Sequence, residues 1–269
     1  MNQKRHEAET LSPRELNSYL HYAVELAQKA GQHTAKYFAK GVEVELKSDQ
    51  SPVTVADRET EQLCRRFIAE DWPTHGVIGE EFGNTDDKGS GLTWVIDPID
   101  GTKSFISGLP LYTVLLALLH NGRPVLGVIH QPILAETVFA AQGLGCFYND
   151  KPTSLRKQDE LAKAWLMCTD PTALHKAHPA PSRRLFDSVY LSRSWGDGYG
   201  YLMVASGRAD IMVDPGMFLW DVACIKPIIE EAGGIFSDLS GGLELGTSCL
   251  VANPILHPQV LTLFNTTGN

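Results

Sequence analysis

One stretch constrains the fold more than any other: residues 94–110, WVIDPIDGTKSFISGLP. The apolar run at residues 93–96 is typical of a buried strand, and it leads directly into Asp97 and Asp100. Pro98 fixes its own φ at about −65° and restricts the residue before it, so the turn between the two carboxylates is rigid. We therefore expect both carboxylates at a strand exit, where side chains can converge on a cleft.

The residue types in this stretch indicate a cation and a phosphate. Neighbouring carboxylates repel each other, which is costly unless a cation compensates them. Carboxylate oxygens suit magnesium, which keeps waters that a substrate phosphate can displace. Gly101 permits close backbone approach, and the N–H groups from Thr102 onward can receive phosphate oxygens. The alternative is that D-P-x-D-G is only a turn.

Two further acidic positions lie outside this stretch. Glu80 follows a short predicted strand in the sequence G-E-E-F-G, and Asp221 opens a predicted helix over residues 221–232. Each has a simpler explanation. Paired Glu residues usually lie on the solvated surface, and Asp221 can serve as an N-cap.

The first half of the chain, residues 1–150, is predicted to form an α+β lobe. Helical spacing predicts helices from residue 12 to about 40 and over 53–70, the first with an N-terminal capping pattern. Strands at 113–120 and 124–131 are separated by Asn-Gly, a strong hairpin signal. We expect helices packed on an antiparallel sheet.

The second half, residues 151–269, is predicted to form an α/β lobe. It begins with a polar, irregular segment that extends to about residue 184. Strands and helices then alternate, which favours α/β structure. The predicted elements are strands at 164–168 and 211–213 and helices at 198–206 and 221–232. We expect the two lobes to form one compact unit.

Composition narrows the class of partner and compartment. A hydrophobic content of 43% predicts a sizeable core, and a net charge of −9 argues against nucleic-acid binding. No apolar run approaches the roughly 20 residues of a membrane span. The five cysteines include no C-x-x-C pair, which favours a reducing compartment. We expect a cytoplasmic protein without a membrane or nucleic-acid partner.

Taken together and in this order, three motifs resemble the inositol monophosphatase family of magnesium phosphatases. They are G-E-E near residue 80, D-P-I-D-G-T near 100, and W-D-x-A near 220 followed by E-E-A-G-G. The resemblance spans roughly residues 47–253. It implies a layered αβαβα sandwich of the inositol monophosphatase and fructose-1,6-bisphosphatase type, a small phosphate monoester as substrate, two or three Mg²⁺ ions and a homodimer.

The resemblance also implies roles for individual residues. The implied metal ligands are Glu80, Asp97, the carbonyl of Ile99, Asp100 and Asp221. The implied catalytic group is Glu80, Thr102, Asp57 and Lys47, where Asp57 lies near the nucleophilic water and Lys47 lies in a loop. The implied substrate-binding group is Asp100, Gly101, Thr102, Arg193, Asp197, Asp214 and Asp221.

Residues 193–201, RSWGDGYGY, resemble the histidinol-phosphate phosphatase branch of the family. Asp197 and Asp214 would suit a substrate that carries an ammonium and an imidazole. Two alternatives stay open: Asp197 caps a helix, and Arg193 contacts either the substrate or a neighbouring subunit. The Tyr112-Thr113 pair departs from the aromatic-glycine pair of that branch.

The leading hypothesis is magnesium-dependent hydrolysis of L-histidinol phosphate, a step of histidine biosynthesis. One alternative is hydrolysis of inositol 1-phosphate or another small metabolite by an enzyme of the same family. A second is a non-catalytic binding or regulatory protein on the same fold. The presence of all the implied acidic ligands and of Thr102 counts against the second alternative.

Overall fold

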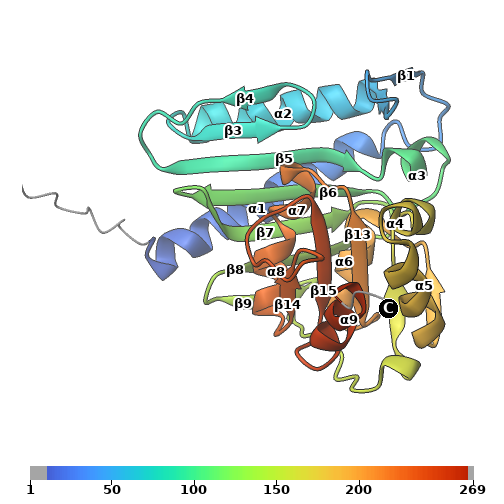
Figure 1. Ribbon diagram of the computed structural model, residues 1–269. Helices are drawn as coiled ribbons and strands as arrows, with labels where there is room; N and C mark the ends of the chain where they lie inside the picture. Colours follow the sequence, from blue (N-terminus) through green and yellow to red (C-terminus); the bar gives the residue numbers. More distant parts are fainter. Residues whose placement is uncertain (1–10, 266–269) are drawn as a thin grey trace, which may run out of the picture.

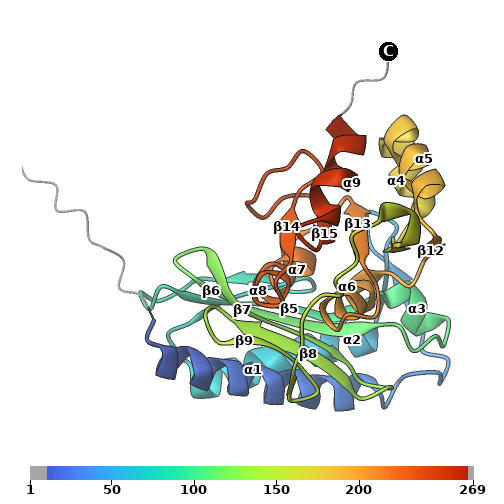
Figure 2. The same ribbon diagram turned by 90° about the horizontal axis from the view of Figure 1, so that it is seen from below.

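Helices and sheets alternate in five layers in the computed structural model, which describes residues 11–265 (Figures 1 and 2). Helices cover the outer face of a larger sheet, lie between this sheet and a smaller one, and cover the far face of the smaller sheet (Figure 2). Three buried apolar clusters fill the spaces between these layers. The predicted layered αβαβα sandwich is therefore confirmed.

Helices α1 (Pro13–Thr34) and α2 (Val55–Asp71) form the first layer. A reciprocal capping box between Ser12 and Glu15 starts α1 as predicted. Its apolar residues recur at helical spacing and face the sheet. The second helix begins two residues later than predicted, because Val53 pairs in a short hairpin before it. This hairpin consists of β1 (Val44–Leu46) and β2 (Pro52–Thr54).

The larger sheet has eight strands among the described residues, and it is mixed rather than antiparallel, because β3 and β5 run parallel. Its strands in spatial order are β10 (Lys151–Pro152), β9 (Gly145–Tyr148), β8 (Glu136–Ala141), β7 (Arg123–Gln131), β6 (Thr113–His120), β5 (Leu92–Asp100), β3 (Gly76–Gly79) and β4 (Gly83–Thr85). Its central strands are buried on both faces, since helices cover both sides.

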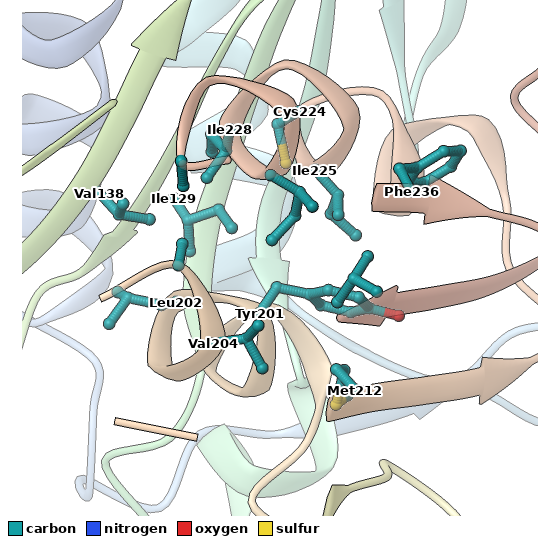
Figure 3. Close-up of a cluster of buried hydrophobic side chains, with 14 of the residues drawn as sticks. Ile129, Val138, Tyr201, Leu202, Val204, Met212, Cys224, Ile225, Ile228 and Phe236 are labelled. Carbon is teal, nitrogen blue, oxygen red and sulfur yellow. The ribbon is translucent and has the colours of Figure 1, made fainter. Parts of the chain in front are cut away.

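The middle layer joins the two sheets. It consists of α6 (Asp197–Ala205), α7 (Leu219–Val222) and α8 (Ile225–Glu231). Figure 3 shows the resulting core, in which Ile129 of the larger sheet, Leu202 of α6, Ile225 of α8 and Met212 of the smaller sheet meet. A short helix, α3 (Thr102–Ile106), follows β5 outside these layers.

The smaller sheet and its outer helices complete the fold. The sheet order is β12 (Leu191–Arg193), β11 (Trp165–Met167), β13 (Ile211–Pro215), β15 (Ser248–Ala252) and β14 (Ile235–Ser237). The outer helices are α4 (Pro171–Ala177), α5 (Pro179–Ser188) and α9 (Leu256–Asn265). A 3₁₀ turn, η1 (Leu161–Lys163), precedes β11.

Two expectations about the second half were wrong. The predicted helix over 221–232 is interrupted between α7 and α8, because Pro227 has no N–H to continue the helical hydrogen bonds across the junction. The segment up to residue 184 is not irregular throughout. Its prolines Pro171 and Pro179 occupy the first positions of α4 and α5, where proline is favourable. Across residues 11–265, no helix has both the length and the apolar composition that crossing a membrane takes.

Candidate metal and phosphate site

A β-bulge brings Asp97 and Asp100 to the same side of β5. Residues three apart on a regular strand point to opposite faces. Here the register with β6 shifts, so that Asp97 pairs with Leu115 and Asp100 pairs with Thr113. The extra residue on β5 reverses the alternation, and the two carboxylates converge. One oxygen each from Asp97, Asp100 and Asp221 lie within 4.8 Å of one another.

Asp221 reaches this cluster from the middle layer. It is the third residue of α7, which packs against β5, and its Oδ2 accepts the backbone N–H of Phe218 at 2.7 Å. The carboxylate therefore satisfies a backbone donor at the start of the helix, although it is not the N-cap residue. Its second oxygen is left for another partner, so the capping and site interpretations are compatible.

The three carboxylates raise each other's cost of ionisation. Burial raises the pKa of Asp97, and repulsion from Glu80 and Asp100 adds to it. Burial likewise raises the pKa of Asp100, with repulsion from Asp197 next in importance. Burial raises the pKa of Asp221 to about 7, against the opposing effect of the Phe218 N–H. Among residues 11–265, no Lys or Arg forms an ion pair with any of the three carboxylates, although the charge of Lys47 lowers the pKa of Asp221.

The donors around the cluster leave one oxygen of each carboxylate without a partner. Asp97 Oδ1 accepts the N–H of Ile99 at 3.0 Å, and Asp100 Oδ2 accepts the hydroxyl of Thr113 at 3.2 Å and the N–H of Gly198. No donor to the second oxygen of Asp97, Asp100 or Asp221 is found within residues 11–265. Three carboxylates that converge, and that each keep one oxygen without a protein donor, are a ligand set that fits a hard divalent cation such as Mg²⁺.

Glu80 lies beside the cluster, where it raises the pKa of Asp97, but its carboxylate is bound to Lys47. The Lys47 ammonium lies 2.7 Å from Glu80 Oε1 and 2.6 Å from Glu81 Oε1. Burial lowers the pKa of Lys47, but the hydrogen bonds to both Glu residues outweigh this and raise it. Burial raises the pKa of Glu81 to about 7. The loop between β1 and β2 is thus fastened to the edge of the site.

Thr102 connects the site to α2. Its hydroxyl lies 3.1 Å from the carbonyl oxygen of Ile99 and 3.5 Å from Asp57 Oδ1. The other oxygen of Asp57 caps the start of α2 through the N–H and the hydroxyl of Thr54. Burial raises the pKa of Asp57 to about 6. The structure therefore brings together the predicted Thr102 and Asp57 and the carbonyl of Ile99.

Gly101 is required by its surroundings. It has φ +84° and precedes α3. A Cβ at this position would lie 2.8 Å from Asp197 Oδ2, so a side chain would collide with that carboxylate as well as strain the backbone. Gly101 therefore lets the turn after β5 approach Asp197 of the second half closely.

A cavity of about 230 Å³ adjoins the cluster. Its lining includes Asp100 and Asp221 of the cluster together with Thr169, Asp197, Tyr201 and Asp214. Burial raises the pKa of Asp197 to about 6, while Lys103 lowers it, and burial raises the pKa of Asp214 to about 7.

The two acidic residues predicted to set specificity are placed differently. Asp197 is the first residue of α6, and its carboxylate does not cap the helix. Asp214 is 4% exposed, and its oxygens accept hydrogen bonds from the N–H and hydroxyl of Thr169 and from the hydroxyl of Tyr201. Of these two residues, Asp197 is therefore the one whose carboxylate is free to contact a substrate in the cavity.

Arg193 is not brought to this cavity. It ends the edge strand β12, is exposed, and donates to the adjacent carbonyl of Ser192 at 2.8 Å. Within the part of the chain that the structure describes, it does not line the cavity.

Three further residues around the site, Glu81, Thr169 and Tyr201, have no role implied by the sequence motifs. Glu81 was treated as surface, but its side chain is only 5% exposed and pairs with Lys47. Thr169 lies in a segment without a recognised motif, and Tyr201 ends the 193–201 stretch, which implied no role for it. The Tyr201 hydroxyl is 3.1 Å from Asp214 Oδ2. Glu81 is the second Glu of the G-E-E motif, which could have pointed to it, whereas no comparable signal marked Thr169.

Comparisons with known proteins agree with this geometry. The Inositol monophosphatase family model matches residues 15–268. The histidinol-phosphatase of Chlorobaculum parvum is 43% identical over 82% of this chain and 86% of its own. The inositol-1-monophosphatase of Mesorhizobium japonicum is 30% identical over 91% of this chain and 95% of its own.

A solved structure shares the same fold. The extragenic suppressor protein suhB of Bartonella henselae superposes with a TM-score of 0.88 at 25% identity, and the match covers 93% of this chain and all of that one. The matched length, the motifs and the layered fold agree, and the chain belongs to the inositol monophosphatase family.

Proposed function

We propose that the chain is a magnesium-dependent phosphomonoesterase whose substrate is L-histidinol phosphate. The observation that carries this proposal is the cluster of Asp97, Asp100 and Asp221, which opens onto a cavity whose wall carries a further carboxylate, Asp197. Family membership supports phosphate ester hydrolysis. The relative named histidinol-phosphatase is more similar to this chain than the inositol-1-monophosphatase is.

The residues that would hold magnesium are Asp97, Asp100 and Asp221, with Glu80 and the Ile99 carbonyl at the margin, and two or three ions would be accommodated. When bound, magnesium lowers the pKa of a coordinated water and neutralises phosphate charge. Glu80 would exchange its contact with the Lys47 ammonium for a role in this site.

The residues beside this site have complementary tasks. Gly101 and Thr102 begin the turn into α3, where backbone N–H groups can hold phosphate oxygens. Asp57 lies within 3.5 Å of the Thr102 hydroxyl and, when ionised, accepts a hydrogen bond from it. This pair orients the water that attacks phosphorus, and Asp57 is suited to accept a proton near neutral pH.

The cavity lining beside the cluster would select the alcohol part of the substrate. Asp197 is a half-buried carboxylate, which would attract an ammonium or a protonated imidazole. We predict that Asp197 contacts this cation, whereas Asp214 is already hydrogen-bonded to Thr169 and Tyr201. Inositol, a neutral polyol apart from its phosphate, would gain little from Asp197.

Inositol 1-phosphate is the second candidate substrate, because a relative with that activity in its name matches 91% of this chain. A cytoplasmic homodimer is a further part of the proposal. Arg193 is exposed at the end of an edge strand, where it is available to a neighbouring subunit.

Phosphate release from histidinol phosphate and from inositol 1-phosphate, measured side by side with Mg²⁺, tests the substrate. We expect kcat/KM for histidinol phosphate to be at least about tenfold higher, since one desolvated charge pair contributes about 1.5–3 kcal/mol. A preference for inositol 1-phosphate would overturn the proposed substrate. No Mg²⁺-dependent release from any monoester would instead favour a binding or regulatory protein.

The Asp197→Asn variant separates recognition from chemistry. Turnover of histidinol phosphate should fall far more than turnover of phenyl phosphate, which carries no cation. Asp187→Asn is a matched control, because Asp187 lies exposed on α5. Equal losses on both substrates would mean that Asp197 has a structural role.

A further inference from the structure

The turn that carries Asp197 has an uncommon backbone. Asp197 has φ +51°, in the left-handed region, which non-glycine residues adopt infrequently, although Asp tolerates it better than most. The next residue, Gly198, donates its N–H to Asp100 of the metal cluster. The turn therefore lies between the metal cluster and the cavity, and something must hold it in this conformation.

Thr169, at the end of β11, makes the contact that holds it. Its Oγ1 lies 2.8 Å from the backbone nitrogen of Asp197 and 2.8 Å from Asp214 Oδ2. A backbone N–H can only donate, so the hydroxyl accepts from Asp197 and gives its own proton to Asp214. The N–H of Thr169 donates to Asp214 Oδ1 at 2.8 Å. Asp214 thus fixes the orientation of the hydroxyl.

The turn also packs directly on Thr169. A Cβ at Gly196 would lie 2.3 Å from Thr169 Cα, so the two backbones are in close contact. On its far side, the Asp197 carboxylate faces Gly101, where a Cβ would lie 2.8 Å from Oδ2. Movement of the turn away from Thr169 would therefore change the direction of the Asp197 carboxylate.

We infer that Thr169 is a positioning residue whose hydroxyl holds Asp197 in its left-handed conformation and thereby sets the preference for phosphate monoesters that carry a cation. The inference rests on the proposed function, because it names the residue through which that selectivity is built. In it, buried Asp214 acts through Thr169 and does not contact the substrate.

Thr169→Val tests the hydroxyl, because valine keeps the shape of the side chain and removes both of its hydrogen bonds. We expect kcat/KM for histidinol phosphate relative to phenyl phosphate to fall about tenfold, mainly through KM, as loss of one well-placed hydrogen bond predicts. Thr169→Ser keeps the hydroxyl and should stay within about twofold of the wild type. Thr172→Val is the matched control, since Thr172 is exposed on α4.

A double-mutant cycle shows whether Thr169 acts through Asp197. In an Asp197→Asn background, Thr169→Val should lower kcat/KM for histidinol phosphate by less than about twofold, because the carboxylate to be positioned is gone. A further tenfold loss in that background would overturn the inference. So would a Thr169→Ser variant as impaired as Thr169→Val.

Failure of the proposed function can be told apart from failure of this inference. A wild-type protein that hydrolyses histidinol phosphate no better than phenyl phosphate would contradict the proposed substrate. The crystal structure of the Thr169→Val variant then decides on Thr169. An Asp197 carboxylate turned away from Gly101 supports the inference, and an unchanged turn overturns it.

Discussion

Carboxylates withdrawn from solvent fall into two groups in this molecule: some have a cationic partner, and others do not. Glu61 is fully buried, yet it accepts hydrogen bonds from Arg65 and from the N–H groups of Glu81 and Phe82. Asp210 likewise accepts hydrogen bonds from the guanidinium of Arg156 and the N–H of Trp165. We refer to Glu61 and Asp210 as the paired carboxylates. Within the described residues, no Lys or Arg forms an ion pair with the metal-site cluster of Asp97, Asp100 and Asp221, and Lys47 acts on Asp221 only through its charge.

This difference supports a role in cation binding for the cluster. Isolated buried charge is expensive, and a folded protein normally supplies a partner for it. This chain supplies partners to the paired carboxylates and withholds them from three others that converge on one point. The missing positive charge is the strongest physical argument that a divalent cation completes the site.

Neutralising one member of the cluster should have the largest effect on activity. We expect Asp97→Asn to lower Mg²⁺-dependent phosphate release at least about 1000-fold, because a metal ligand is lost. The same variant should be at least as stable as the wild type in EDTA, since repulsion from Asp100 and Glu80 is reduced. Full activity of Asp97→Asn, or a loss of its stability in EDTA, would contradict the distinction between the cluster and the paired carboxylates.

The same substitution at a paired carboxylate should have the opposite outcome. Asp210→Asn leaves the Arg156 guanidinium without its carboxylate partner, so the free energy of unfolding in urea should fall by about 3 kcal/mol. Phosphate release per folded molecule should stay within about twofold of the wild type. A large loss of turnover with unchanged stability would mean that Asp210 belongs to the functional site.

Added magnesium should stabilise only the protein with an intact cluster. At about 100 times its Kd, Mg²⁺ should raise the free energy of unfolding by about 2.7 kcal/mol and Tm by about 5–10 °C. Asp97→Asn should show little of this shift, whereas Asp210→Asn should show all of it. Equal shifts in both variants would locate the binding elsewhere.

His130 is a third kind of buried ionisable group, one that is neutral at pH 7 in the folded protein. Burial lowers its pKa to about 4 from an ordinary value of 6.5. Between these values the unfolded chain binds the proton and the folded protein does not, so stability is lost as pH falls below about 6.5. From pH 7 to pH 5 the loss attributable to His130 is about 2 kcal/mol. Urea unfolding at both pH values should show a steeper loss for the wild type than for His130→Asn, and equal losses would contradict this.

The structure brings together Asp97, Asp100 and Asp221 as the sequence predicted, the first two from a strong local pattern and the third from the family resemblance. Asp97 and Asp100 follow a buried strand, and Pro98 restricts the turn between them. The convergence of the two side chains, however, depends on the bulge in β5 against β6, which no local pattern announces.

The features missed by the sequence argument are those set by distant contacts. From its local sequence Glu81 resembles a surface residue. It is covered only because Lys47, 34 residues away in the chain, lies on a loop that folds against it. Thr169 gains its role only when β11 lies beside the turn of Asp197. Pro227 marks the break before α8, but the predicted helix over residues 221–232 did not allow for it. Local patterns and the family resemblance therefore predicted which carboxylates converge better than they predicted the residues that support them.

The most direct test of the account is to locate the cation itself. Crystals grown with Mn²⁺ in place of Mg²⁺ would show manganese by its anomalous scattering. We predict at least one peak coordinated jointly by Asp97, Asp100 and Asp221, and none at the paired carboxylates. Manganese absent from that cluster in crystals of active protein would contradict the central claim.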